Sequence, residues 1–212
     1  MGILDWLKGK LYSKQPKTWR NAYSSNIGDE MSRCLKKELK ANGNEEKIIR
    51  SVISEFRVLH SGLNISDNII KEIILDSLYG AQRVSSLAKH LTDLPKKDAE
   101  KVVGDIKFST QFNLNKYRAL SLGLKWYRWS GVQACPLHKH MKDVFVRWDT
   151  PPSVDILKDG SPIPHHAGTQ WGCKCYAETV VDVKGMYKPP YKVCLGNEII
   201  KMSQQDFLKI FK

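Results

Sequence analysis

The sequence predicts an α+β protein, in which a helical region comes first and a small domain with a short antiparallel sheet follows. Up to residue 123, apolar side chains recur at helical spacing, whereas beyond Leu124 short stretches alternate and are rich in aromatic residues. Cysteines and histidines cluster in the second half, which predicts a zinc ion that holds this domain together. We therefore expect a helical bundle (1–123), an α+β domain with a Cys/His metal site (124–183), and a C-terminal hairpin with a short helix (184–212).

The helical region begins with a short apolar stripe, bounded by lysines, that consists of Ile3, Leu4, Leu7 and Leu11. Such a stripe docks either on the body of its own protein or in the groove of a partner. From Asn44 a second periodic stretch predicts a helix that ends near Ser61-Gly62. Its apolar positions are Ile49, Val52, Ile53, Phe56 and Leu59.

The next helix is predicted to start after Ser66, which suits an N-cap, with Asp67 in the first turn. A further helix is expected at about 96–107, and the set predicts an antiparallel bundle. Two helices joined through Ser-Gly also occur in helix-turn-helix motifs, but no basic recognition face stands out, which favours packing. The run after Ser66 keeps one apolar face and stops before Pro95; its members are Ile70, Ile73, Ile74, Leu78, Val84, Leu87 and Leu91.

Three strands are predicted in the second half, at 124–130, 144–149 and 175–183. The segment 153–172 between the last two has turn signals and little apolar content, so we expect a loop. The stretch 191–202 predicts a hairpin about Gly196-Asn197. Ser203 and Asp206 then resemble a capping box that opens a final short helix.

Length and composition are those of a soluble globular protein: 212 residues, 42% hydrophobic and 26% charged. The N-terminus fits neither a secretory signal nor a myristoylation motif, and no apolar stretch is long enough to span a membrane, so a cytosolic protein without membrane contact is expected. The net charge of +12 is spread along the chain. This charge implies either weak, salt-sensitive attraction to polyanions without base readout, or a surface that serves solubility.

Metal-ligand spacing occurs in two stretches, CPLHKH (135–140) and PHHAGTQWGCKC (164–175). Cys135-x-x-His138 provides one chelating pair, and Cys173-x-Cys175 provides a second. The other nearby candidates are His140, His165 and His166. Two close pairs separated by a strand and a long loop are typical of a structural zinc site, which would fix a loop that has no core of its own.

Two other interpretations of these residues remain open. In the first, the cysteines are separate buried residues and the histidines are surface residues, with no metal between them. A catalytic metal is the second alternative, in the form of a metal-dependent nuclease acting on DNA. Only Asp143 and Asp149 are nearby acids, and no HExxH or HxE…PCxxC pattern is present, which favours the structural interpretation.

The order of motifs between about 110 and 183 resembles the phage Mu F-like minor head protein (head morphogenesis) family. The motifs, in order, are Tyr127-Arg128-Trp129-Ser130, Pro136-Leu137-His138, Arg147-Trp148-Asp149-Thr150-Pro151-Pro152, His166-Ala167-Gly168 and Cys173-Lys174-Cys175-Tyr176-Ala177. The sequence departs from the family pattern at Asp143, where Gly is usual, at Ala167, where Pro is usual, and at Lys174, where Arg is commoner. Phe145 also stands one position before the usual aromatic.

The resemblance implies a set of metal ligands and a role. The candidate ligands are Cys135, His138, His166, Cys173 and Cys175, of which a tetrahedral zinc needs four, so that either Cys135 or His166 would be left out. The implied protein is a non-enzymatic minor capsid component of a tailed phage or prophage, found in few copies in the virion and in the host cytoplasm during assembly. Its implied partners are the portal protein, the major capsid or scaffold protein, and packaged DNA through non-specific charge.

Overall fold

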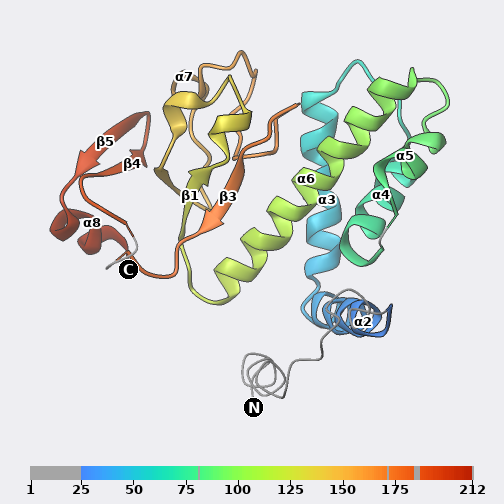
Figure 1. The fold of residues 1–212 in the computed structure, drawn as a ribbon, viewed down its shortest axis with the longest axis horizontal. Helices are drawn as coiled ribbons and strands as arrows, with labels where there is room; N and C mark the ends of the chain where they lie inside the picture. Colours follow the sequence, from blue (N-terminus) through green and yellow to red (C-terminus); the bar gives the residue numbers. More distant parts are fainter. Residues whose placement is uncertain (1–24, 81, 171, 184–186, 212) are drawn as a thin grey trace, which may run out of the picture.

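The computed structural model describes residues 25–80, 82–170, 172–183 and 187–211. The predicted apolar stripe from Ile3 to Leu11 lies outside these residues. The architecture is α+β, as predicted: helices α2 to α6 form one end of the molecule and a five-stranded sheet with α8 forms the other (Figure 1). No helix in the described ranges combines the length and apolarity required to cross a membrane.

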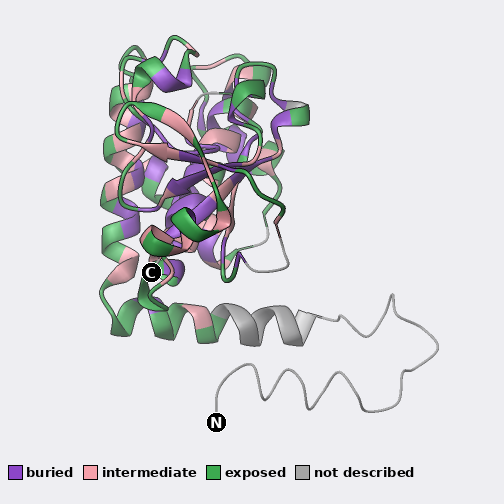
Figure 2. Ribbon diagram, turned by 90° about the vertical axis from the view of Figure 1, so that its left-hand side faces the viewer, coloured by how far each residue is buried: buried purple, intermediate pink, exposed green. Residues whose placement is uncertain are grey.

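The first half of the chain consists of helices that pack their apolar faces together. In α3 the buried positions Ile48, Ile49, Val52 and Phe56 recur at helical spacing. The helices are α2 (Ser25–Ala41), α3 (Asn44–Leu59), α4 (Asp67–Tyr79), α5 (Val84–Leu87), the 3₁₀ turn η1 (Ala88–His90) and α6 (Lys96–Ser121). Figure 2 shows the buried residues concentrated in the body of the molecule, with α2 along one edge.

The apolar run predicted after Ser66 starts as expected but is not continuous. Ser66 caps α4, because its side chain accepts a hydrogen bond from the backbone N–H of Ile69. The helix ends at Gly80, where a Cβ atom would lie 2.0 Å from Oδ1 of Asp76. That carboxylate also accepts from the backbone N–H of Gln82 at 3.4 Å, so the chain leaves the helix here and turns into α5.

Helix α6 is much longer than the predicted 96–107, because it continues to Ser121. No proline or glycine interrupts residues 105–122, and Gly123 follows the C-terminus with a positive φ of 74°. The two ends of α6 pack in different hydrophobic cores. Val102 and Ile106 belong to the core of the helical half, whereas Phe112 and Ala119 pack in the core of the sheet half.

The sheet is mixed, and the prediction of an antiparallel sheet is wrong for one pair of strands. The strand order is β3-β1-β2-β4-β5, in which β2 and β4 run parallel and all other neighbours are antiparallel. Strand β3 pairs with the side of β1 opposite to β2. The chain then crosses back to the free edge of β2, where β4 runs in the same direction as β2. The strands are β1 (Trp126–Ser130), β2 (Val144–Arg147), β3 (Tyr176–Thr179), β4 (Tyr191–Leu195) and β5 (Glu198–Met202).

The central strands are buried on both faces. On β1, Trp126 contributes to one core and its neighbour Tyr127 to the other, as the alternation of a strand requires. Helix α8 (Gln204–Phe211) covers the first face through Phe207. The second face contacts Phe112 of α6 and the Cys/His residues. The predicted loop 153–172 begins with one short helix, α7 (Val154–Leu157).

Candidate metal centre

The candidate ligands lie at one end of two adjacent strands, where β1 ends and β3 begins. Strands β1 and β3 are antiparallel, so the end of β1 and the start of β3 are close together. Cys135 follows the 3₁₀ turn η2 (Val132–Ala134) after β1, and His138 directly precedes η3 (Lys139–Met141). Cys173 and Cys175 directly precede β3. The pairing of two strands therefore brings both chelating pairs together.

A glycine makes the approach of these segments possible. Gly131 leaves β1 with a φ of 76°, a conformation that L side chains rarely adopt. A Cβ atom at this position would lie 2.8 Å from the ring of Tyr176 on β3. The chain can thus turn sharply toward Cys135 while β3 stays close.

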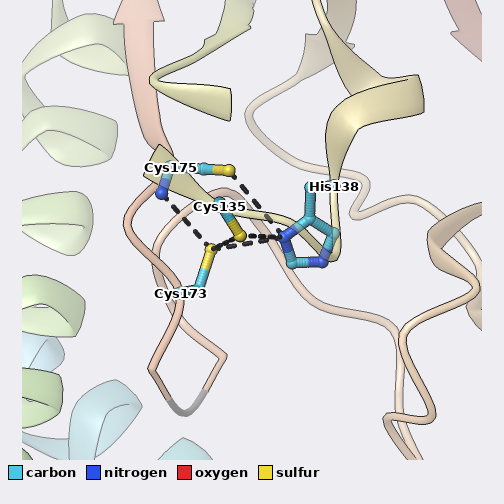
Figure 3. A group of neighbouring side chains, drawn as sticks. All are labelled: Cys135, His138, Cys173 and Cys175. Atoms are coloured by element: carbon cyan, nitrogen blue, oxygen red, sulfur yellow. Dashed lines mark hydrogen bonds between the residues drawn. The ribbon is translucent and has the colours of Figure 1, made fainter. Parts of the chain in front are cut away.

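The four donor atoms of Cys135, His138, Cys173 and Cys175 all lie within 4.8 Å of one another (Figure 3). Nδ1 of His138 is 3.3 Å from Sγ of Cys135, 3.4 Å from Sγ of Cys173 and 3.8 Å from Sγ of Cys175. The Sγ atoms of Cys135 and Cys173 are 3.9 Å apart.

These distances match the edges of a zinc tetrahedron. Bonds of about 2.3 Å to sulfur and about 2.0 Å to nitrogen place neighbouring sulfurs about 3.8 Å apart, and sulfur and nitrogen about 3.5 Å apart. The donors also have the chemistry that zinc prefers, since three are thiols and one is an imidazole. The residues present therefore fit a structural zinc ion.

All four ligand residues are buried, with exposed fractions of 0–2%. Without metal, the buried environment favours the protonated form of the Cys173 thiol. A hydrogen bond with Cys175 and burial raise the pKa of this thiol to about 12. Burial lowers the pKa of His138, but hydrogen bonds with Cys173, Asp159 and Cys135 outweigh it and raise the value to about 9. Zinc binding would displace these protons, which couples metal affinity to pH. The backbone N–H of Cys175 also donates to Sγ of Cys173 at 3.4 Å, which favours a thiolate there.

His166, the fifth predicted ligand, does not join the cluster. Its Nδ1 lies 3.0 Å from the hydroxyl of Tyr127, and its ring stacks on Phe112 of α6 with centroids 4.7 Å apart. Burial lowers the pKa of His166 well below its ordinary value, so the ring is neutral. Of the two residues that sequence left as alternatives, His166 is therefore outside the donor set and Cys135 is within it.

The other candidates from the sequence have separate partners. Nε2 of His140 lies 2.8 Å from the carbonyl oxygen of Ile156. Asp143 pairs with Arg128 at 3.0 Å, and Asp149 pairs with Arg147 at 2.6 Å. The Arg147 guanidinium lowers the pKa of Asp149 to about 2. Neither carboxylate belongs to a metal-ligating group in the part of the chain that the structure describes.

Sequence reasoning missed Asp159, which lies directly behind His138. Its Oδ2 is 2.8 Å from Nε2 of His138 and 2.6 Å from Nε2 of His165. In the sequence, Asp159-Gly160 is a turn signal only, and its distance of 21 residues from His138 gives no indication of contact.

The geometry defines an α+β protein with a closed, buried cluster of three cysteines and one histidine that can hold a metal ion. No protein-family model, curated protein or solved structure matches the chain.

Proposed function

We propose that this chain is a minor head protein of a tailed phage or prophage, and that Cys135, His138, Cys173 and Cys175 bind a structural zinc ion. The protein would be a low-copy component associated with the portal and procapsid, in the virion and, during assembly, in the host cytoplasm. The single observation that carries the proposal is the convergence of Cys135-x-x-His138 with Cys173-x-Cys175. His138, Cys173 and Cys175 belong to the ordered motifs on which the resemblance to the Mu F-like family rests, and Cys135 directly precedes one of them.

The closed donor set supports a structural role for the metal over a catalytic one. A catalytic zinc keeps one position for water or substrate, whereas four protein donors fill a tetrahedron. Burial of all four ligands points the same way, because a substrate would have no route to the ion. When bound, zinc would supply a fixed link between the turn after β1 and the segment before β3.

Each part of the chain has a role in this proposal. The helical bundle (1–123) would dock on the portal, capsid or scaffold protein, and the domain 124–183 would present a rigid surface held by zinc. Residues 184–212 would extend the sheet. The net charge of +12 supports additional, non-specific contact with packaged DNA.

The first experiment is quantitative mass spectrometry of purified virions and procapsids from the strain that carries the gene, with this chain counted against the major capsid protein. A few copies per particle are expected. Absence from both particles would reject the virion role. Metal content of the purified protein, with about one zinc per chain expected, tests the metal centre separately.

The competing function, a metal-dependent nuclease, has its own test. Cleavage of plasmid DNA that requires a divalent cation, and that is lost in a folded His166→Ala variant, would replace the structural proposal. We expect no cleavage, since four buried protein donors would leave no position on the metal for water or substrate.

A further inference from the structure

Behind the metal ligands lies a chain of hydrogen bonds from His138 through Asp159 to His165. The three side chains are 0–2% exposed. Oδ2 of Asp159 accepts from both imidazoles, and its Oδ1 accepts from the backbone N–H of Ser161 at 3.0 Å. Nδ1 of His165 lies 3.0 Å from the carbonyl oxygen of His166, which anchors the far end of the chain to the backbone.

This group of two histidines and one carboxylate is a hydrogen-bond network and not a second metal site. Ligands that share a metal at about 2.0–2.1 Å lie about 3 Å or more from one another. The nitrogen–oxygen distances here, 2.6 and 2.8 Å, are those of charge-assisted hydrogen bonds.

We infer that Asp159 is the positioning residue of the metal centre: it fixes His138 in the tautomer and orientation in which Nδ1 binds the ion. A carboxylate only accepts hydrogen bonds, so Nε2 of His138 must carry a hydrogen. Nδ1, which faces the three sulfurs, is then the nitrogen whose lone pair would bind the ion. A metal-bound histidine commonly donates its other N–H to such a carboxylate, which also makes the imidazole a stronger ligand. This inference rests on the zinc centre proposed above.

His165 has the second part of this role. Because it holds the same oxygen of Asp159 and is tied to the backbone at His166, it keeps the carboxylate from turning away from His138. The two neighbouring histidines thus have different roles. His165 supports the metal centre indirectly, and His166 packs against Phe112. The segment from Asp159 to His166, which has little core of its own, is in this way connected to the metal.

The test compares metal binding by the full-length wild type with binding by Asp159→Ala, Asp159→Asn and His165→Gln. Zinc affinity is measured by competition with a chromophoric chelator, and the ligand field by the visible absorption of the cobalt(II) form. We expect Asp159→Ala to weaken zinc binding roughly 10- to 100-fold and to change the cobalt bands. Asp159→Asn should weaken zinc binding less, because its amide oxygen still accepts from Nε2 of His138. The zinc affinity of His165→Gln should lie between that of Asp159→Asn and that of the wild type.

The matched control is Asp155→Asn, an exposed aspartate four residues away. It should bind zinc as the wild type does. Tryptophan fluorescence and thermal unfolding of the zinc-saturated proteins identify any variant that fails to fold, in which case Asp159→Asn and His165→Gln decide the result.

The outcomes separate this inference from the proposed function. A wild type that binds neither zinc nor cobalt rejects the zinc centre, and with it the role of Asp159. A wild type that binds zinc, together with folded Asp159 variants of the same affinity and the same cobalt spectrum, rejects only the positioning role. Zinc affinity that is lowest in Asp159→Ala, intermediate in Asp159→Asn and highest in the wild type supports the positioning role of Asp159.

Discussion

The two halves of the molecule are stabilised by different kinds of interaction. The core of the helical half is almost entirely aliphatic, with Ile48, Ile70, Ile74 and Val102 each fully buried. The sheet half buries aromatic rings together with cysteines and histidines. Aliphatic burial is non-directional and tolerates repacking, whereas thiols and imidazoles are stable in a core only when their polar atoms have partners. The helical half can therefore rely on its own packing, and the sheet half depends on precise geometry.

Several features of the sheet half indicate this dependence. The indole N–H groups of Trp126, Trp129 and Trp148 are buried without a hydrogen-bond partner among the described residues. Such groups weaken a core unless other interactions compensate. We expect the metal centre to supply that compensation, which leads to four predictions of decreasing size.

The largest effect is expected on removal of the metal. Strong chelation, or the substitution Cys173→Ser, should remove a contribution on the order of 10 kcal/mol and abolish the fixed structure of the sheet half. The near-ultraviolet circular dichroism of the buried tryptophans should collapse, while the far-ultraviolet signal of α3, α4 and α6 is largely kept. Cys34→Ser, at an exposed position on α2, is the control. Unchanged tryptophan signals after complete zinc removal would show that the sheet half does not depend on the metal centre.

A cavity in the aliphatic core should affect stability but not the metal. Ile74, fully buried in α4, belongs to the core of the helical half. Ile74→Ala should lower the free energy of unfolding by about 2–5 kcal/mol, measured by urea denaturation of the zinc-loaded protein. Zinc content and the cobalt spectrum should stay as in the wild type. A loss of metal in the folded variant would mean that the two halves are not separable in this way.

A smaller effect concerns the contact between the halves. Oδ1 of Asp105 on α6 accepts from the backbone N–H of Gly172, next to Cys173, at 3.1 Å. Burial raises the pKa of Asp105 to about 6, so the folded state binds this proton more tightly than the unfolded state does. The contribution of Asp105 to stability should therefore fall as pH rises from about 4 to above 6.

The variant Asp105→Asn tests this pH dependence, since an amide oxygen still accepts from Gly172 but does not titrate. The difference in melting temperature between variant and wild type should be small near pH 4 and should grow in favour of the variant by pH 7. A constant difference across this range would show that Asp105 does not contribute through its proton.

The smallest effects are expected at two helix caps, one in each half. Ser66 caps α4, and Ser203 accepts from the backbone N–H of Asp206 at 3.2 Å at the start of α8. Each change to alanine should cost about 1 kcal/mol in thermal or chemical unfolding. Neither should change zinc affinity, because both caps act on local helix ends. A cap variant that lost zinc would show that helix ends and metal centre are linked.

Much of the local structure could be predicted from the sequence. The helix from Asn44 to Leu59, the N-cap at Ser66 and the hairpin about Gly196-Asn197 are all present. These features depend on residues that are close in the chain, namely on apolar periodicity, capping side chains and turn residues. The predicted extent of α6 was too short, because the second half of the helix is fixed by burial of Phe112 and Ala119 against the sheet.

The sequence by itself determined the α+β class and the two chelating pairs, since both depend on spacings within a few residues. Tertiary structure decided which pairs meet, because the pairing of β1 with β3 brings Cys135 next to Cys173, which comes 38 residues later in the chain. It also decided the roles of the two adjacent histidines and brought Asp159 behind His138. Tertiary structure likewise decided that β4 joins the free edge of β2 and runs parallel to it. Such contacts between distant residues depend on the packing of the whole chain, and no local pattern encodes them.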